Sequence, residues 1–161
     1  MLHHNYLQPD ARIVCGEGRG LRGKAPEAED LTRLLKSRGL KITAQRILIA
    51  EAISSLDHPA AVDVYRYVSR KMPTIGLATV YRTISLFKKA GIIRELTDLK
   101  NSTRFELRTE PHVNVMCVNC GRIWDMEAHR SRKILRYLSR IGLNPVGCDV
   151  LVVCRHCRER R

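Results

Sequence analysis

The chain has 161 residues, of which 44% are hydrophobic, and it carries a formal net charge of +13, with 29 Lys and Arg against 16 Asp and Glu. This length allows one medium-sized hydrophobic core or two small ones. So large a positive charge is unusual for an enzyme acting on small molecules and indicates a polyanionic partner, with solubility as the simpler alternative. No stretch approaches the roughly 20 apolar residues of a membrane span, so no membrane partner is expected.

The first 25 residues mix Gly, Arg, Pro and acidic side chains without apolar periodicity, which predicts a disordered or loosely held extension over residues 1–25. They contain no apolar run of signal-peptide length, so we expect a cytoplasmic protein with reduced cysteines. The positive charge lies further along. Residues 31–110 hold 15 Lys and Arg against 7 Asp and Glu, and residues 111–161 hold 10 against 4.

The segment from Pro26 to Gly91 has the period of amphipathic helices, interrupted at short intervals by Gly and Pro. Four helices are predicted, and Thr43 is placed to cap the second. The residues expected to face the core are Leu31, Leu34 and Leu35, then Ile49, Ala52, Ile53 and Leu56, then Ala61, Val64, Tyr65 and Val68, and in the fourth helix Leu77, Val80, Ile84 and Phe87. The residues of the fourth helix expected to turn outward or lie at the border of the core are Thr79, Arg82, Thr83 and Lys89.

After Gly91 the period changes to two, over residues 92–96 and 103–107, with residues 98–102 as the connecting turn. This pattern predicts a β-hairpin. Short helices followed by a hairpin are typical of a winged helix-turn-helix, here over residues 26–108, whose recognition helix (residues 77–90) enters a DNA major groove. Related modules bind proteins, and the basic excess favours DNA.

A second unit is predicted over residues 112–161, after a proline-containing linker at 109–111. It should contain strands at 113–117, 122–126 and 149–153 and a helix at 128–141. The overall class is therefore α+β, a winged helix followed by a small α/β domain. About 50 residues bury little core, so metal ligation and pairing with a second copy would both stabilise this unit.

Two Cys-x-x-Cys pairs, Cys117/Cys120 and Cys154/Cys157, lie in this second unit. Two intervening residues let one tight turn direct both sulfurs at one point, and two such turns complete the tetrahedron that Zn²⁺ prefers. The spacing therefore predicts a structural zinc site. A pair of disulfides, a redox dithiol or an iron–tetracysteine electron carrier would use the same residues.

Four sequence blocks resemble the ferric uptake regulator family of metal-responsive repressors: residues 39–46 (GLKITAQR), 76–83 (GLATVYRT), 104–107 (RFEL), and His112 followed by Cys117-x-x-Cys120. The resemblance extends from about Leu31 to Cys157. It implies a homodimeric repressor of metal homeostasis or peroxide stress genes that binds double-stranded DNA. It further implies an N-terminal winged helix, a C-terminal dimerisation domain and a sensory metal between them.

The DNA-contacting positions of the family fall on Lys41, expected near the minor groove, and on Thr79, Tyr81 and Arg82 of the recognition helix. Arginine can form a bidentate bond to guanine or hold a phosphate, and a tyrosine ring can pack on a thymine methyl. We expect the DNA site to be an AT-rich inverted repeat. Partial core burial of Tyr81 and a merely solvated helix face at Arg82 are the competing interpretations.

By the same resemblance, the sensory metal site maps to His58, Glu106, His112 and Asp125. The family usually has a His-x-His near the linker, whereas here the second histidine is replaced by Asn114, expected to be a weak fifth ligand or a support for the others. The resulting oxygen-rich set suits Fe²⁺ or Mn²⁺ better than Zn²⁺. Asp rather than Glu at position 125 resembles the peroxide-sensing branch.

Other functions predict different behaviour. A zinc-responsive member of the same family would respond to Zn²⁺, and a zinc-ribbon module that binds nucleic acid or protein would sense no metal. The family's auxiliary metal site is not expected, because Cys148 stands about where one of its histidines would be. Enzymatic activity and a small-molecule substrate are not expected either, since no Gly-rich phosphate loop or nucleophile with a recognisable base is present.

Overall fold

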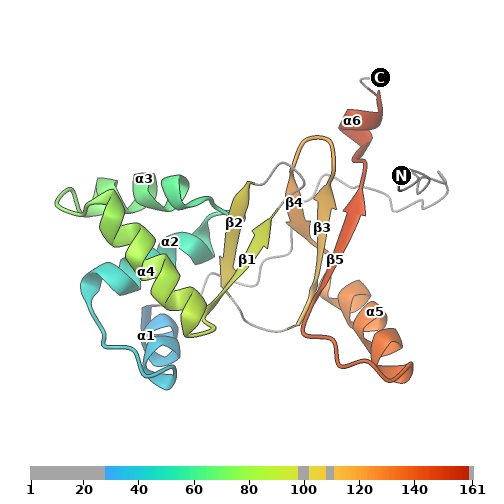
Figure 1. Ribbon diagram of the computed structural model, residues 1–161, viewed down its shortest axis with the longest axis horizontal. Helices are drawn as coiled ribbons and strands as arrows, with labels where there is room; N and C mark the ends of the chain where they lie inside the picture. Colours follow the sequence, from blue (N-terminus) through green and yellow to red (C-terminus); the bar gives the residue numbers. More distant parts are fainter. Residues whose placement is uncertain (1–27, 98–101, 108–110, 160–161) are drawn as a thin grey trace, which may run out of the picture.

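The computed structural model describes residues 28–97, 102–107 and 111–159, which form helices and two small sheets (Figure 1). The predicted N-terminal extension, the hairpin turn at 98–101 and residues 109 and 110 of the predicted linker lie outside these ranges. The elements in chain order are α1 (Ala28–Ser37), α2 (Ala44–Ser55), α3 (Ala61–Lys71), α4 (Leu77–Lys89), β1 (Ile93–Thr97), β2 (Thr103–Leu107), β3 (Val113–Cys117), β4 (Ile123–Asp125), α5 (Ala128–Arg140), β5 (Cys148–Val152) and α6 (Arg155–Glu159). Within the described ranges, no helix has the length and apolarity needed to cross a bilayer.

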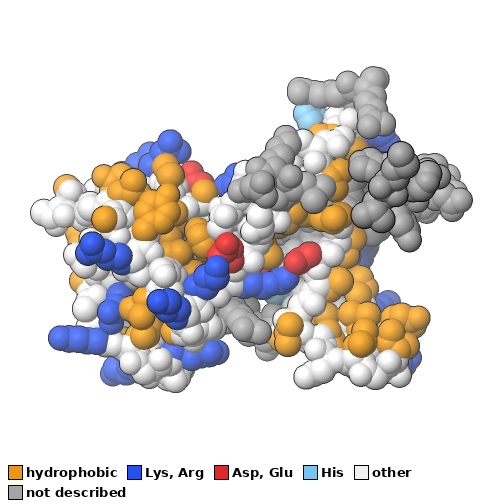
Figure 2. All heavy atoms as spheres, in the orientation of Figure 1, with side chains coloured by type: hydrophobic (Ala, Val, Ile, Leu, Met, Phe, Trp, Pro, Cys, Tyr) orange, Lys and Arg blue, Asp and Glu red, His pale blue; other side chains and the backbone are white. Residues whose placement is uncertain are grey.

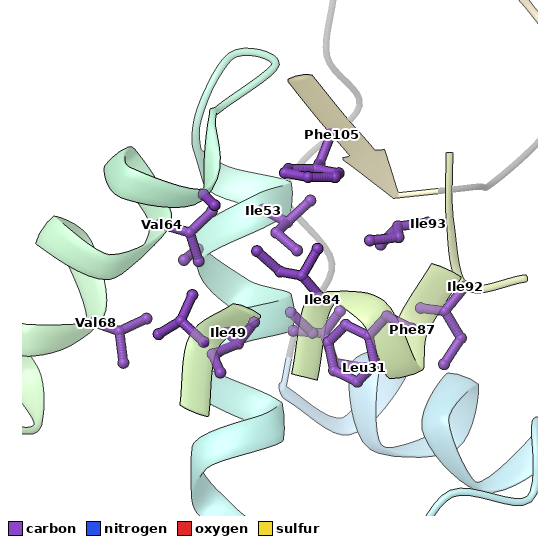
Figure 3. Close-up of a cluster of buried hydrophobic side chains, with 14 of the residues drawn as sticks. Leu31, Ile49, Ile53, Val64, Val68, Ile84, Phe87, Ile92, Ile93 and Phe105 are labelled. Atoms are coloured by element: carbon purple, nitrogen blue, oxygen red, sulfur yellow. The ribbon is translucent and has the colours of Figure 1, made fainter. Parts of the chain in front are cut away.

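Helices α1 to α4 enclose the larger hydrophobic core (Figure 3). The predicted cap of α2 is confirmed, because the Thr43 hydroxyl accepts a hydrogen bond from the backbone N–H of Arg46 at 3.3 Å. The predicted apolar stripes are buried at most of their positions, which are Leu31, Leu35, Ile49, Ala52, Ile53, Ala61, Val64, Val68, Val80, Ile84 and Phe87. Helix α3 ends at Lys71, before Met72-Pro73, as the proline predicts.

The inward face of α4 differs from the prediction at two positions. Leu77 is 40% exposed, and Thr83, expected outside or at the border, is buried. The first turn of α4 extends beyond the core, so the buried stripe begins one turn later, and Thr83 lies within it, three residues after Val80 and four before Phe87. Tyr81 is 49% exposed and, within the described residues, is not among those that form the helical core or pack against it.

The hairpin β1–β2 lies between the helices and the second sheet (Figure 1). Its register pairs Arg94 with Glu106, and its first strand begins one residue later than predicted. Phe105 contributes to the helical core, while the next residue, Glu106, is only 8% exposed although it points to the opposite face. Both faces of the hairpin are therefore covered, one by the helices and one by the second half of the chain.

The second sheet has the strand order β4-β3-β5, with β3 antiparallel to β4 and parallel to β5. Every residue of the central strand β3 is buried. Helix α5 contributes buried Leu135 and Ser131, and the Ser131 hydroxyl accepts from the Val113 backbone N–H at 3.3 Å. On the hairpin side, Leu96 of β1 joins Met116 and Ile123 in a small apolar cluster. The short helix α6 was not predicted.

Candidate metal centres and DNA-binding surface

The four cysteines of the two Cys-x-x-Cys pairs converge at one end of the second sheet. Their sulfur atoms all lie within 4.8 Å of one another. The parallel pairing of β3 and β5 explains this, because it places Cys117 opposite Val152, and the chain reaches Cys154 two residues later. The Sγ atoms of Cys120 and Cys154 are 3.9 Å apart, close to the roughly 3.8 Å edge of a tetrahedron with Zn–S bonds of about 2.3 Å.

The electrostatics of this cysteine cluster also fit a cation. Burial raises the pKa of the Cys117 thiol, but backbone N–H groups, including that of Cys154 at 3.3 Å, outweigh burial and lower this pKa to about 6. Burial and the three neighbouring cysteines raise the pKa of Cys157 to about 12. Cys117 thus ionises readily, whereas the raised pKa values of Cys120 and Cys157 mean that these two thiols resist ionisation unless positive charge is added, as in a tetrathiolate zinc site.

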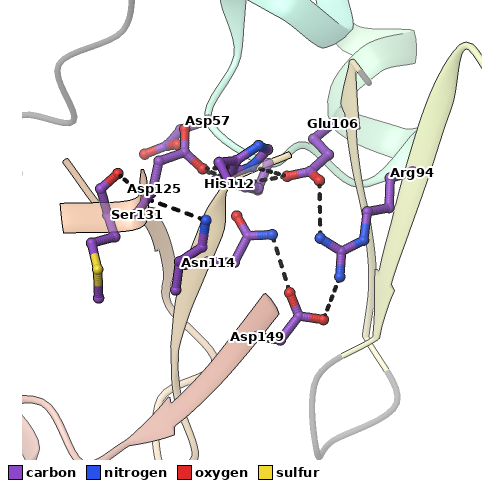
Figure 4. A network of polar contacts seen from close by, with 11 residues as sticks. Asp57, Arg94, Glu106, His112, Asn114, Asp125, Ser131 and Asp149 are labelled. Atoms are coloured by element: carbon purple, nitrogen blue, oxygen red, sulfur yellow. Dashed lines mark hydrogen bonds and ion pairs between the residues drawn. The ribbon is translucent and has the colours of Figure 1, made fainter. Parts of the chain in front are cut away.

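A second cluster joins the two halves of the molecule and contains the four residues predicted to bind the sensory metal (Figure 4). His58 follows α2, Glu106 lies in β2, His112 precedes β3, and Asp125 ends β4. The backbone N–H of Phe105 donates to the carbonyl of Pro59 at 2.9 Å, which holds the His58 loop against β2. His58 has φ of 44°, the only positive φ outside glycine in the described residues, a strained conformation of the kind found at functional sites.

Nitrogen and oxygen donors meet closely in this cluster. His58 Nε2 lies 3.4 Å from Glu106 Oε2 and 3.2 Å from Asp125 Oδ1. His112 Nε2 lies 3.3 Å from the same Glu106 oxygen and 3.5 Å from the same Asp125 oxygen. The other ring nitrogen of His58, Nδ1, is 3.0 Å from Asp57, which would leave Nε2 free to bind a metal.

The surroundings of this cluster favour positive charge. Burial lowers the pKa of His58, but hydrogen bonds to Asp125, Asp57 and Glu106 outweigh burial and raise it to about 11. Burial raises the pKa of Glu106, but the two histidines and Arg94 outweigh burial and lower it to about 2. A partly buried site, with His58 and Glu106 buried and His112 and Asp125 more exposed, therefore fits a divalent cation with mixed nitrogen and oxygen ligands.

Two further charged residues adjoin this cluster and were missed by the sequence reasoning. Arg94 of β1 lies 3.6 Å from Glu106 Oε1 and 2.6 Å from Asp149 Oδ2 of β5. Asp149 Oδ1 in turn accepts from the amide nitrogen of Asn114 at 3.2 Å. Arg94 could have been found from the hairpin register, which places it opposite Glu106, but no local pattern connects it to Asp149.

The residues predicted to contact DNA lie in the helical half, where several separate groups of Lys and Arg side chains are exposed on the face shown in Figure 2. Tyr81 and Arg82 are exposed in the first half of α4, and Lys41 is exposed just before α2. Thr79 is half-buried at the start of α4. The structure thus exposes an aromatic residue and an arginine at consecutive positions of the helix that follows the turn after α3.

A winged helix coupled through a candidate metal site to a second domain with a tetracysteine cluster defines a class, the metal-responsive DNA-binding regulators. Comparison with known proteins agrees, since residues 37–152 match the model of the ferric uptake regulator family. The chain belongs to this family. It is therefore a metal-responsive transcriptional regulator, not an enzyme, of a family whose members bind DNA as dimers.

Three relatives illustrate the similarity. The chain is 32% identical over 137 residues to the peroxide-responsive repressor PerR of Staphylococcus epidermidis, covering 83% of this chain and 91% of that protein. It resembles the structure of the Campylobacter jejuni peroxide stress regulator with a TM-score of 0.62 and 28% identity, over 79% of this chain and 98% of the other. It resembles the ferric uptake regulator of Pseudomonas aeruginosa with manganese with a TM-score of 0.64 and 27% identity, over 78% and 98%.

Proposed function

We propose that this protein is a repressor whose affinity for DNA is set by Fe²⁺ or Mn²⁺ bound at His58, Glu106, His112 and Asp125. The observation that carries the proposal is that four segments, two from the winged-helix half and two from the rest of the chain, bring these donors together between the halves. Support for the metal comes from the mixed nitrogen and oxygen donor set, which contains no thiolate, and from the manganese in the Pseudomonas aeruginosa relative.

The mechanism is a coupling between metal binding and the relative orientation of the two halves. A cation held by ligands from all four segments favours one orientation, because only that orientation offers all the ligands at once. The chain's own residues already favour that docking through the contacts of His58 with Asp125 and of His112 with Glu106. In a dimer, fixing this orientation also fixes the distance between two recognition helices and therefore the spacing of the DNA half-sites.

The proposed target is an AT-rich inverted repeat in double-stranded DNA, bound in the cytoplasm by a homodimer through Lys41, Thr79, Tyr81 and Arg82. An inverted repeat matches the two-fold symmetry of a dimer. Exposed apolar side chains on α5, on the segment after it and on the edge strand β5 support a dimer contact there (Figure 2). The large apolar side chains exposed there are Tyr137, Ile141, Leu143, Val146 and Leu151.

For the cysteine cluster, we propose that Cys117, Cys120, Cys154 and Cys157 hold a structural Zn²⁺. The sulfur spacing and the lowered pKa of Cys117 support this assignment. Because the site uses four protein ligands, it leaves no position for a substrate or a solvent molecule, as is usual for zinc that only stabilises a fold.

The decisive experiment measures DNA binding by the zinc-loaded protein to its own promoter region during separate titrations with Fe²⁺, Mn²⁺, Zn²⁺ and Ni²⁺. Fe²⁺ or Mn²⁺ should raise DNA affinity, and His112→Ala should abolish this increase while the zinc content stays constant. His129→Ala is the matched control, because His129 is exposed on α5, where its Nδ1 lies 3.5 Å from Glu127, and it is not part of the candidate metal site. Full DNA binding with Zn²⁺ at lower free concentration than Fe²⁺ or Mn²⁺ would instead identify a zinc-responsive regulator. No metal effect at all would identify a zinc-ribbon module.

The same assay separates a peroxide-stress regulator from a metal-homeostasis regulator. Similarity to peroxide-responsive proteins and the Asp at position 125 support the first. We expect hydrogen peroxide to release the iron-loaded protein from DNA and to leave the manganese-loaded protein bound. Equal resistance of both forms would assign the protein to metal homeostasis.

A further inference from the structure

The side chain of Asn114 combines complete burial with an unused hydrogen-bond acceptor. It is 0% exposed, and its oxygen Oδ1 is the only buried side-chain nitrogen or oxygen in the described residues without a partner. Its nitrogen Nδ2 donates to Asp149 Oδ1 at 3.2 Å. A buried polar atom without a partner is costly and calls for a physical explanation, such as an ion that it binds.

Strand pairing places Asn114 at the centre of a polar row. Its Cα partners are Asp125 on β4 and Asp149 on β5, so the three side chains project from one face of the sheet. Since the Asp149 carboxylate can only accept hydrogen bonds, the amide must turn its NH₂ to Asp149 and its oxygen away from it. In Figure 4 that oxygen points to the side on which His112 and Glu106 lie.

Arg94 holds the Asp149 carboxylate, which in turn orients the Asn114 amide. Its guanidinium binds Asp149 Oδ2 at 2.6 Å and approaches Glu106 Oε1 at 3.6 Å, so it occupies one oxygen of each carboxylate. The remaining oxygens are Asp149 Oδ1, which holds Asn114, and Glu106 Oε2, which faces both histidines. Gly147 leaves room for this arrangement, because a Cβ there would lie 2.9 Å from Arg94 Nη1.

We propose that the carbonyl oxygen of Asn114 is the fifth ligand of the regulatory cation and that Arg94 and Asp149 are positioning residues that direct it there. This inference rests on the proposed function. It gives the cation two nitrogen and three oxygen ligands, a set that favours Mn²⁺ and Fe²⁺ over Zn²⁺. Because Arg94 lies on the hairpin and Asp149 on the second sheet, docking of the two halves strengthens the hold on the carboxylate that orients the fifth ligand.

The test is the dissociation constant for Mn²⁺ of the zinc-loaded full chain, measured by competition with a fluorescent chelator. Asn114→Ala and Asp149→Asn should each weaken Mn²⁺ binding about 10- to 100-fold, the usual effect of losing a ligand's support. Asp149→Asn keeps the shape of the side chain but no longer dictates which end of the amide faces the cation. The matched control is Asp30→Asn, which removes a carboxylate from the exposed Arg33–Asp30 pair and should change nothing.

A double mutant shows whether Asp149 acts through Asn114. In the Asn114→Ala background, Asp149→Asn should weaken Mn²⁺ binding no further, because the group it orients is gone. Asn114→His should restore tight binding, since an imidazole can donate to Asp149 through one nitrogen and bind metal through the other, and it should shift the preference toward Zn²⁺. With Co²⁺ as the probe, the absorption spectrum of Asn114→Ala should change to that of a lower coordination number.

The inference is overturned if Asn114→Ala binds Mn²⁺ as tightly as the wild type, or if Asp149→Asn has the same effect in both backgrounds. His112→Ala, measured in parallel, separates this failure from that of the proposed function. Loss of Mn²⁺ binding in His112→Ala alone would leave the proposed function standing without the fifth ligand. Unchanged binding in both variants would place the regulatory metal elsewhere.

Discussion

The two halves of this chain reach stability by different physical means. The helical half buries large apolar side chains completely, among them Leu31, Leu35, Ile49 and Phe87. The second half buries mainly one strand and part of α5, and it leaves side chains such as Tyr137 and Val146 more than half exposed. A core therefore supplies the stability of the first half, whereas the second half is the one that the proposed zinc and a partner surface would stabilise.

Removal of zinc should have the largest effect on stability and should unfold only the second half. Structural zinc contributes about 10–16 kcal/mol of apparent binding energy in small domains, and this energy is folding energy where the core is small. We expect Cys120→Ser to lose the metal and the dimer while the helices α1–α4 persist. Elemental analysis, sedimentation and circular dichroism measure the three quantities, and an intact dimer without zinc would contradict the assignment.

The reciprocal change truncates Phe87, the largest fully buried side chain of the first core. Phe87 is fully buried, so Phe87→Ala should lower the free energy of unfolding of the helical half by about 3–5 kcal/mol. Chemical denaturation measures this loss, and zinc content should stay at the wild-type level because the cysteine cluster belongs to the other half. Phe87→Leu, which leaves a smaller cavity, is the control and should cost less. Zinc release by Phe87→Ala would show that the halves do not fold separately.

The difference between the halves also explains what could be predicted from the sequence. In the first half, apolar periodicity located the helices, since a core imposes its period on the residues that face it. It failed at Leu77 and Thr83, because periodicity gives the phase of a helix but not the point where the core ends. In the second half, the Cys-x-x-Cys spacing predicts a zinc site without any knowledge of how the strands pair.

Long-range pairing accounts for what could not be predicted. The parallel alignment of β3 with β5 joins residues 35 positions apart, such as Asn114 and Asp149, and no local pattern encodes it. The contact of Arg94 with Asp149 depends on that alignment and on the docking of the hairpin. Helix α6 has only five residues, too few to show a helical period. The resemblance to a family supplied the proposed ligand residues, and the structure added the side chains that we propose orient them.

Substituting one exposed arginine in each half tests which half binds DNA, because both halves are basic but only one carries the proposed recognition helix. Arg82→Ala on α4 should weaken specific DNA binding by about 1–3 kcal/mol. Arg136 on α5 is also exposed, and Arg136→Ala should leave DNA binding unchanged, which makes it the matched control. Anisotropy titrations at several salt concentrations measure both. Equal binding by Arg82→Ala and the wild type would move the recognition surface away from α4.

The smallest expected effect concerns a single cap in the helical half. The Thr43 hydroxyl satisfies the N–H of Arg46 at the start of α2, so Thr43→Ala should lower the free energy of unfolding of this half by about 1 kcal/mol. Thr32 provides the control, because its hydroxyl only donates back to the Ala28 carbonyl of its own helix at 2.8 Å and caps no free N–H. Thr32→Ala should therefore change stability by less than about 0.5 kcal/mol. If the two substitutions cost the same, the hydroxyl of Thr43 does not stabilise α2, and the helix depends on its buried face alone.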